Sequence, residues 1–314
     1  MYSKFNSGLI PGQFDVVGLG LNAMDYISIL PHFPQPQAKV RISEVRLEPG
    51  GQVATALTTC ARLGLKGCYI GSVGSDHLGN LQLESLRREG LDISSIRTVE
   101  GATSQIAFII LEEGIGERTI LWHRDDRLIF PSEELPQEVI LSGRLLHLDG
   151  RDSRAALQAA RWAKDADIPI VIDIDQIYDG TTHTLLSIVD YLISAEDFAL
   201  RITNSRDPET AIKVLADRYQ APITGITLGE SGAIFSHKGN LIKSKAFKAP
   251  VVDTTGAGDV FHGAFIFGIL EGWSLEKTIT FSHAVAALKC TKIGARTGIP
   301  DLEATIQFLK SHGD

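Results

Sequence analysis

Alternation of short apolar runs with segments of helical periodicity limits the fold of this chain more than any other feature. From about residue 143, we expect strands at 144–148, 168–174, 190–194 and 223–228, separated by helices at 154–167, 181–189 and 208–219. Strands that alternate with helices of about 10–15 residues are typical of a parallel sheet covered on both faces. Because crossovers between parallel strands are right-handed, the sequence predicts a three-layer αβα domain with a mainly parallel sheet.

The first half of the chain contains two β-rich stretches, at about 24–48 and 103–124, that fit no such alternation. In the first, residues 39–47 alternate apolar and polar side chains, which predicts a strand with one wet face. In the second, two β-rich runs flank the turn-like segment 112–117, which predicts a hairpin. We expect a single domain over residues 1–314, in which the two stretches form a small β-sheet lid.

Charge and cysteine content limit the binding partners and the cellular compartment that we expect for this chain. The 314 residues carry a net charge of −8 and no long basic run, so nothing indicates binding to nucleic acid or to an anionic membrane. No apolar run reaches about 18 residues, and the first residues lack the apolar core of a signal peptide. The three cysteines have no CxxC spacing, which argues against a disulfide framework or a zinc site. We therefore expect a cytoplasmic protein.

The segment Asp253-Thr254-Thr255-Gly256-Ala257-Gly258-Asp259 precedes an apolar run, 260–270, that predicts a buried helix. Glycine-rich backbone lets a ligand approach consecutive N–H groups closely. A helix amino terminus adds free amides and the positive end of its dipole, so an anion is the expected guest.

Asp259 stands at the same helix start, where a carboxylate can accept a proton from a nearby hydroxyl. An anion hole beside a base suits transfer of a phosphoryl group to an alcohol. A helix cap and a plain turn would also explain a lone Gly-x-Gly-Asp. The complete heptad followed by a small-residue helix favours the catalytic interpretation.

At this point the sequence resembles the ribokinase-like, or PfkB-type, carbohydrate kinases. DTTGAGDVFHGAF (253–265) is similar to their carboxyl-terminal signature, and residues 49–64 and 71–80 resemble their di-glycine motif and the segment that follows it. The resemblance covers nearly the whole chain. It implies a core with a β lid, the use of ATP and Mg²⁺, and transfer to a hydroxyl of a small sugar or sugar-like substrate.

The resemblance also assigns residues. Asp259 is the base, with Gly256, Ala257 and Gly258 as the anion hole. Acceptor contacts fall on Asp25, Gly50, Gly51, Gln52 and Thr55, and ATP contacts on Thr227, Gly229, Gly232 and His283. Plain structural roles are open for some of them: Asp25 as a turn residue, His283 as a core histidine, Gly229 and Gly232 as turn glycines. Gln52 and Thr55 replace the Lys and Asn of ribokinase-type members, so the acceptor contacts from that helix differ.

Two cation sites follow from the same resemblance. Asp253, Thr255, Gly294 and Gly298 resemble a monovalent-cation site, for which K⁺ is the expected ion. The NxxE motif that organises Mg²⁺ through water corresponds to residues 194–197, where Ser194 replaces the amide and Asp197 retains a carboxylate.

Several alternatives stay open. Segments 147–152 and 171–176 are most similar to the ketohexokinase and sulfofructose kinase branches, which favours a ketose-type acceptor. A nucleoside acceptor and a non-catalytic sugar-binding regulator are the alternatives. Residues 18–23 match the dinucleotide fingerprint GxGxxA, but the prolines that follow deny the helix it requires. The lid exposes apolar strand faces at Ile106, Phe108 and Ile110, so we also expect a homodimer formed through it.

Overall fold

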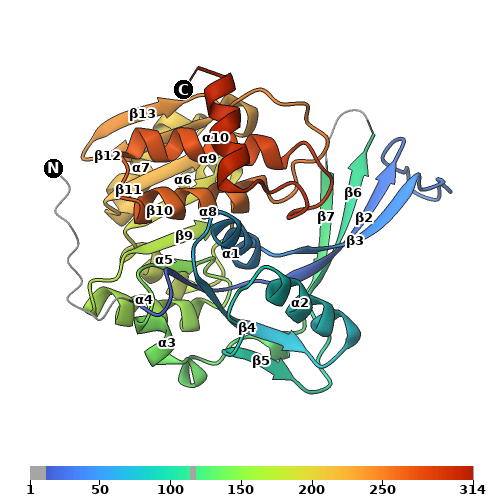
Figure 1. Ribbon diagram of the computed structural model, residues 1–314, viewed down its shortest axis with the longest axis horizontal. Helices are drawn as coiled ribbons and strands as arrows, with labels where there is room; N and C mark the ends of the chain where they lie inside the picture. The colour runs from blue at the N-terminus through green and yellow to red at the C-terminus, as the bar shows by residue number, and fades with distance from the viewer. Residues whose placement is uncertain (1–11, 114–117, 314) are drawn as a thin grey trace.

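A nine-stranded sheet lies at the centre of the computed structural model, which describes residues 12–113 and 118–313 (Figure 1). In spatial order its strands are β13 (Asn240–Ser244), β12 (Ala233–His237), β11 (Ile223–Thr227), β10 (Tyr191–Ala195), β9 (Ile170–Ile174), β8 (Leu146–Leu148), β1 (Val16–Leu19), β4 (Gly67–Gly74) and β5 (Ile96–Val99). Neighbours pair in parallel from β11 to β5, whereas β12 and β13 are antiparallel. The predicted mainly parallel sheet is confirmed.

Helices cover both faces of this sheet, because successive residues of its buried strands point to opposite sides. In β1, Val17 packs in the cluster under one helical layer and Val16 in the cluster under the other. The first layer contains α3 (Gln137–Leu141), α4 (Ser153–Asp165), α5 (Gly180–Leu186), α6 (Glu196–Thr203) and α7 (Pro208–Tyr219). The second contains α1 (Gln52–Arg62), α2 (His77–Arg88), α8 (Ala257–Leu270) and α9 (Leu275–Lys289), with α10 (Leu302–Ser311) packed against α9. The three-layer αβα architecture is confirmed.

Helix α8 is apolar on nearly all sides because it packs on the sheet between α1 and α9. Gly263 permits the contact with α1: a Cβ atom at this position would lie 2.4 Å from the Ala56 carbonyl oxygen. The two helices therefore meet backbone to backbone, and their amino termini start from the same end of the sheet.

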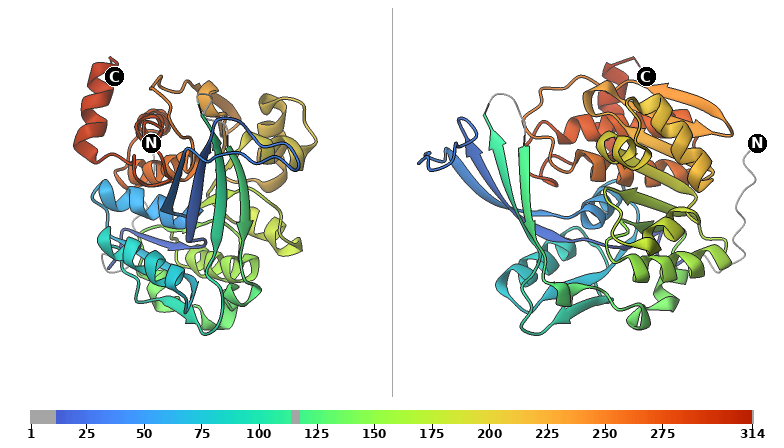
Figure 2. Two further views of the ribbon diagram at one scale, coloured as in Figure 1. Left: turned by 90° about the vertical axis from the view of Figure 1, so that its right-hand side faces the viewer. Right: turned by 180° about the vertical axis from the view of Figure 1, so that it is seen from behind.

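The smaller sheet has the order β3 (Glu44–Gly50), β2 (Ala23–Leu30), β6 (Ile106–Glu112) and β7 (Arg118–His123), and it projects from the main body (Figures 1 and 2). β6 and β7 pair antiparallel, as the hairpin prediction required, although the turn at 114–117 lies outside the described residues. The expected strand at 39–47 starts later, at Glu44, and continues to Gly50.

Each face of this lid has its own set of side chains. Leu47, Tyr26, Phe108 and Leu121 are cross-strand neighbours that form one row on the outer face. The rings of Tyr26 and Phe108 stack at 5.3 Å, and Phe108 remains 48% exposed. The alternate residues of β6, Ala107 and Ile109, are buried on the inner face.

Short 3₁₀ turns at Asp126–Leu128, Ser132–Glu134 and Gly229–Ser231 complete the described elements. None of the described helices is long and apolar enough to cross a membrane. The amino-terminal residues 1–11, to which the signal-peptide prediction applied, lie outside the described part of the chain.

Candidate active site

A pocket of about 310 Å³ lies between the lid and the carboxyl ends of the parallel strands. The carboxyl end of a parallel sheet is where α/β domains usually bind ligands. The walls come from four parts of the chain: the lid with its approach (Leu21, Ala23, Asp25, Gln105, Ala107, Ile109, Arg118, Ile120, Trp122), the start of α1 (Gly51, Gln52), the loops after β8 and β9 (Arg151, Asp175, Gln176, Tyr178), and the segments around the start of α8 (Thr255, Gly256, Asp259, Ala295).

The anion hole predicted at the start of α8 borders this pocket through Gly256, whereas Ala257 and Gly258 are not among the lining residues. Gly256 is the amino-terminal cap of the helix with φ 75°, a left-handed conformation that favours glycine. The Ala257 amide donates to the Thr254 carbonyl at 3.1 Å. Within the described residues, the amides of Gly256 and Gly258 have no acceptor. Of the three predicted residues, Gly256 and Gly258 are thus the ones whose amides can bind an anion.

Asp259, in the first turn of α8, is partly exposed to the same pocket. Its pKa is raised to about 7, chiefly by burial and then by the Asp173 carboxylate, whereas His262 and Arg118 act in the opposite direction. His262 lies behind it, with Nδ1 2.9 Å from the Gly258 oxygen and 3.6 Å from Asp173 Oδ2. A carboxyl group that titrates near neutral pH is suited to proton transfer.

Asp25 contributes a second carboxylate to the pocket from β2. Burial raises its pKa to about 7, against the opposing effect of Arg296. Gly50 and Gly51 allow the close approach at this point. A Cβ atom on Gly50 would lie 2.1 Å from Asp25 Oδ2, and Gly51 has φ 90° with no room for a side chain beside the Asn22 backbone. Of the predicted acceptor residues, Asp25, Gly51 and Gln52 line the pocket, whereas Gly50 is not among the lining residues.

Thr55 has a different position from the one expected for an acceptor contact. It is fully buried, and its hydroxyl accepts a hydrogen bond from Arg296 Nε at 3.2 Å. Arg296 also donates to Asn22 Oδ1 at 2.9 Å and to the Gly50 carbonyl. This buried arginine, which the sequence analysis did not select, connects the 294–298 loop to the di-glycine loop.

Two further arginines give the pocket positive charge, and the sequence analysis missed both. Arg118 reaches from lid strand β7 to the Thr254 hydroxyl beside the anion hole. Arg151 follows β8, and its guanidinium lies 4.6 Å from the Trp122 ring centroid and 4.9 Å from that of Tyr178. The only available signal for Arg151 was its place in the 147–152 segment that resembled the ketohexokinase branch.

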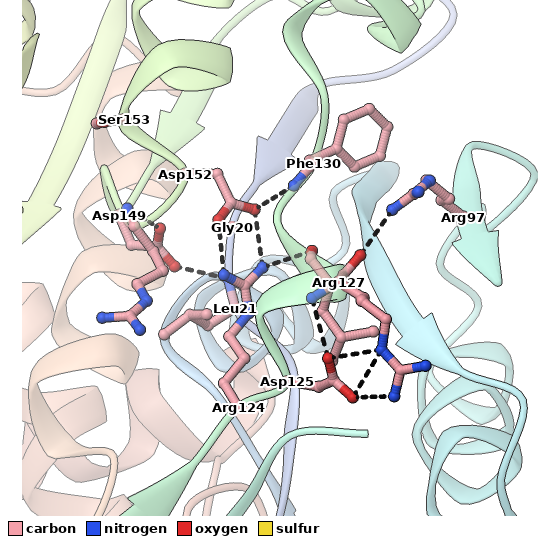
Figure 3. A network of polar contacts seen from close by, with 12 residues as sticks. Gly20, Leu21, Arg97, Arg124, Asp125, Arg127, Phe130, Asp149, Asp152 and Ser153 are labelled. Carbon is pink, nitrogen blue, oxygen red and sulfur yellow. Dashed lines mark hydrogen bonds and ion pairs between the residues drawn. The ribbon is translucent and has the colours of Figure 1, made fainter. Parts of the chain in front are cut away.

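The base of the lid is held by a polar network (Figure 3). Arg124, which follows β7, forms a buried ion pair with Asp152, at 2.6 Å between Nη1 and Oδ1. In the same loop, Asp149 Oδ2 accepts from the Leu21 amide at 2.6 Å and Oδ1 from the Arg151 amide at 2.9 Å. Both the entry to β2 and the exit from β7 are thus fixed to the loop that carries Arg151.

The residues predicted for ATP do not line this pocket. Gly229 has φ 57° and no atom near the position of a Cβ, whereas a Cβ on Gly232 would lie 1.9 Å from the Ser244 oxygen. Thr227 ends β11, and its hydroxyl lies 3.4 Å from the Ser194 oxygen. His283 is buried against Phe261, its Nε2 has no partner among the described residues, and burial lowers its pKa to about 4.

The structure treats the two predicted cation sites differently: the residue predicted for Mg²⁺ is exposed, whereas two residues predicted for the monovalent cation are in contact. Asp197 is in the first turn of α6, its side chain 87% exposed and paired with Arg201. No group of three or more His, Cys, Asp or Glu side chains in the described residues could hold a metal ion. Asp253 and Gly294, by contrast, are in contact: the Gly294 amide donates to Asp253 Oδ2 at 2.8 Å.

The pocket under the lid combines free backbone amides at a helix start with two carboxylates. In a three-layer α/β domain this arrangement suits one class of protein, the phosphotransferases that use an alcohol as acceptor. The comparisons with known proteins give the family. The profile of the pfkB family carbohydrate kinases matches residues 13–302, and the chain belongs to this family.

Relatives of known sequence and structure agree. The chain is 30% identical over 302 residues to the ribokinase of Haemophilus influenzae, covering 93% of this chain and 97% of that one. It is 28% identical over 305 residues to a nucleoside kinase of Methanothermobacter thermautotrophicus, covering 95% and 97%. A crystal structure of an Agrobacterium tumefaciens protein regarded as a ribokinase matches with a TM-score of 0.89 at 27% identity, over 96% and 99% of the chains. The chain is therefore an ATP-dependent kinase for sugar-like substrates.

Proposed function

We propose that this chain transfers the γ-phosphoryl group of ATP to a hydroxyl of a ketose-type sugar, with Asp259 as the general base. The observation that carries the proposal is that Asp259, Gly256 and Asp25 line one pocket of about 310 Å³. A base, an anion hole and a carboxylate that can orient a polyol thus lie within reach of one small acceptor.

The reaction follows from these positions. Asp25 and the Gly51 loop hold the sugar through its hydroxyl groups. Asp259 accepts the proton of the reacting hydroxyl as its oxygen bonds to the γ-phosphorus and the bond to the bridging oxygen of ADP breaks. The amides of Gly256 and Gly258 stabilise negative charge on the phosphoryl oxygens, and the positive charge of Arg118 lies beside them.

Mg²⁺ belongs to the proposal as the ion that neutralises the phosphates of ATP. Mg²⁺ usually keeps several waters and is held by one or two carboxylates plus substrate phosphates. Asp197 could contribute one such carboxylate through water. Its exposure and its pairing with Arg201 fit an outer position better than direct coordination.

For the nucleotide, we propose the surface around the end of β11 and the middle of α9, where His283 lies. Gly229 leaves open space for a ligand, and the unpartnered His283 Nε2 is a buried polar atom of the kind that an adenine ring could satisfy. Thr227 and Gly232 shape the same loop.

The ketose preference rests on the loops after β8 and β9. Arg151 and Gln176, from the two segments that resemble the ketohexokinase branch, both line the acceptor pocket. An ADP-release assay with ribose, fructose, other ketohexoses and nucleosides tests the proposal. Turnover should be fastest with a ketose. If nucleosides are phosphorylated faster than sugars, the acceptor is a nucleoside and not a ketose. If a sugar binds without ADP release, a non-catalytic sugar-binding regulator is favoured.

We further propose that the lid serves as a dimer contact. Its outer row of Leu47, Tyr26, Phe108 and Leu121 forms an apolar strip across all four strands. A four-stranded sheet with apolar side chains on both faces is more stable when both are covered. The inner face covers the acceptor pocket, so a second copy of this chain is our choice for the outer one.

Light scattering on the wild type and on Phe108→Lys tests this contact. The wild type should have the mass of a dimer at micromolar concentration, and the variant that of a monomer. Ile306→Lys on α10 makes the same apolar-to-lysine change outside the lid and should leave the mass unchanged. A monomeric wild type, or a dimeric Phe108→Lys, would refute the lid interface.

For location, we propose the cytoplasm. All three cysteines, Cys60, Cys68 and Cys290, are free and buried, as expected in a reducing compartment.

A further inference from the structure

Lys289, the last residue of α9, is completely buried, with 0% of its surface exposed. A lysine is almost never fully buried without a partner, because removing an ammonium from water is costly. Its Nζ donates a hydrogen bond to the backbone oxygen of Asp253, at 2.9 Å. The lysine side chain is thus directed to the first residue of the anion-hole segment.

The residues predicted for a monovalent cation contact either Lys289 or Asp253. Asp253 is fully buried, and its carboxylate accepts from the amides of Thr255 and Gly294, each at 2.8 Å. Gly298 packs directly on Lys289: a Cβ atom there would lie 2.2 Å from the Lys289 carbonyl oxygen. Burial alone would raise the pKa of Asp253, but the Lys289 charge and these hydrogen bonds lower it overall.

We propose that the Lys289 ammonium takes the place of a monovalent cation beside the anion hole, so that this kinase does not require K⁺. The proposal rests on the proposed function for the role of the anion hole, and on the contacts of Lys289 for the identity of the charge.

The same contacts occupy the oxygen atoms that a K⁺ ion would need as ligands. The Asp253 oxygen is already bonded to Nζ, and both carboxylate oxygens of Asp253 are bonded to backbone amides. A K⁺ ion at these atoms would also lie next to a like charge in a buried site, where screening by water is weak. The site therefore fits the lysine of the chain rather than a second cation.

Lys289 acts as a positioning residue. Its bond to Asp253 holds the segment that leads to Gly256 and Gly258, and its charge contributes to lowering the pKa of Asp259. A tethered ammonium is present at every turnover, whereas a bound ion is present only at sufficient concentration. The sequence places this charge at a helix end, where it would ordinarily be taken for an exposed lysine.

Two measurements on the wild type test the proposal without any substitution. Its kcat/KM should change less than about two-fold between no KCl and about 0.1 M KCl, at an ionic strength held constant with tetramethylammonium chloride. Its melting temperature should be the same in the two salts, because no K⁺ binds the native state. Activation of several-fold by K⁺, or a K⁺-specific rise in melting temperature, would overturn the proposal.

Lys289→Met removes the charge and keeps an unbranched side chain. In the absence of K⁺ we expect kcat to fall by about ten-fold or more, because the segment that leads to Gly256 and Gly258 is no longer held in position. In Lys289→Ala, which also empties the space of the side chain, KCl should raise both activity and melting temperature, since an ion can then enter beside the Asp253 oxygen. Full activity of Lys289→Met without K⁺ would contradict the assigned role.

Lys292→Met is the matched control, because it removes a lysine charge from an exposed position three residues away. It should behave as the wild type in both salts. If Lys289→Met does not fold, the two wild-type measurements still decide the question. The melting temperatures need no substrate, so they remain informative even if no acceptor in the sugar panel is phosphorylated.

Discussion

Gly258→Val isolates contact with the phosphoryl group from any effect on the fold. Gly258 is exposed and has no left-handed φ, and a Cβ placed there would meet no described atom within 4 Å beyond its chain neighbours and the backbone of its own helix. Valine is no worse than glycine in a helix, so the free energy of unfolding should change by less than about 0.5 kcal/mol. For a domain of this size that is a melting-temperature shift below about 2 °C.

Activity should respond very differently. The transferred phosphoryl group must approach the free amides of Gly256 and Gly258, and a branched side chain beside them keeps it away. Loss of one oxyanion-hole donor costs about 10²–10³ in kcat, so we expect at least about 10²-fold, or about 2.7 kcal/mol of transition-state stabilisation. Steady-state kinetics and a thermal melt on the same preparation measure both quantities.

Substitutions at two other glycines serve as controls for this result. Gly180 begins α5 and also has open space at its Cβ, so Gly180→Val should leave both stability and kinetics unchanged. Gly256 has φ 75°, and its Cβ would lie 2.8 Å from that of Ala295. Gly256→Ala should therefore lose about 2 kcal/mol or more of stability as well as activity. Normal kinetics in Gly258→Val would refute the anion hole.

Three further predictions concern the carboxylates. Asp259→Asn should lower kcat by about 10²–10⁴ but change the affinity for ATP only a few-fold, because a base acts in the transition state and not in nucleotide binding. A turnover assay measures the first quantity and calorimetry with ATP the second, and an active variant would exclude Asp259 as the base. The kcat/KM of the wild type should fall as the pH drops through about 7, where both Asp259 and Asp25 gain a proton and the base can no longer accept one. A pH–rate profile that stays flat through this range would contradict the role of these carboxylates. Gly50→Ala should raise the acceptor KM by about ten-fold or more, since its Cβ would displace the Asp25 carboxylate, and an unchanged KM would show that Asp25 does not hold the acceptor.

Local pattern was enough for the elements that bury a continuous apolar run. The strands at β9 and β10 and helix α7 were predicted within a few residues, because their burial is encoded in consecutive side chains. The β12–β13 hairpin was not predicted: its outer strand is half-buried and reads as an ordinary polar segment. The start of β3 was placed too early, because alternation alone does not fix where pairing with β2 begins.

For the site, motifs located the residues whose backbone conformation is unusual, such as Gly51 and Gly256. They did not locate charges that act over long separations in the sequence. Arg296 bonds to Asn22, 274 residues away, and Lys289 bonds to Asp253, 36 residues away. Neither residue has a local signature, since burial of an arginine or a lysine depends on what the rest of the fold packs around it.

The close contact of α1 with α8 fixes the catalytic side of the pocket independently of the side that selects the acceptor. Both helices start at the pocket, and Gly263 locks their backbones together, so the reacting groups at their amino termini have a fixed mutual position. The opposite wall, with Trp122, Arg151 and Gln176, comes from the lid and from loops. Mutations in that wall can therefore alter which molecule is accepted while the chemistry is inherited intact, and a chain built this way can diverge toward new acceptors in small, individually viable steps.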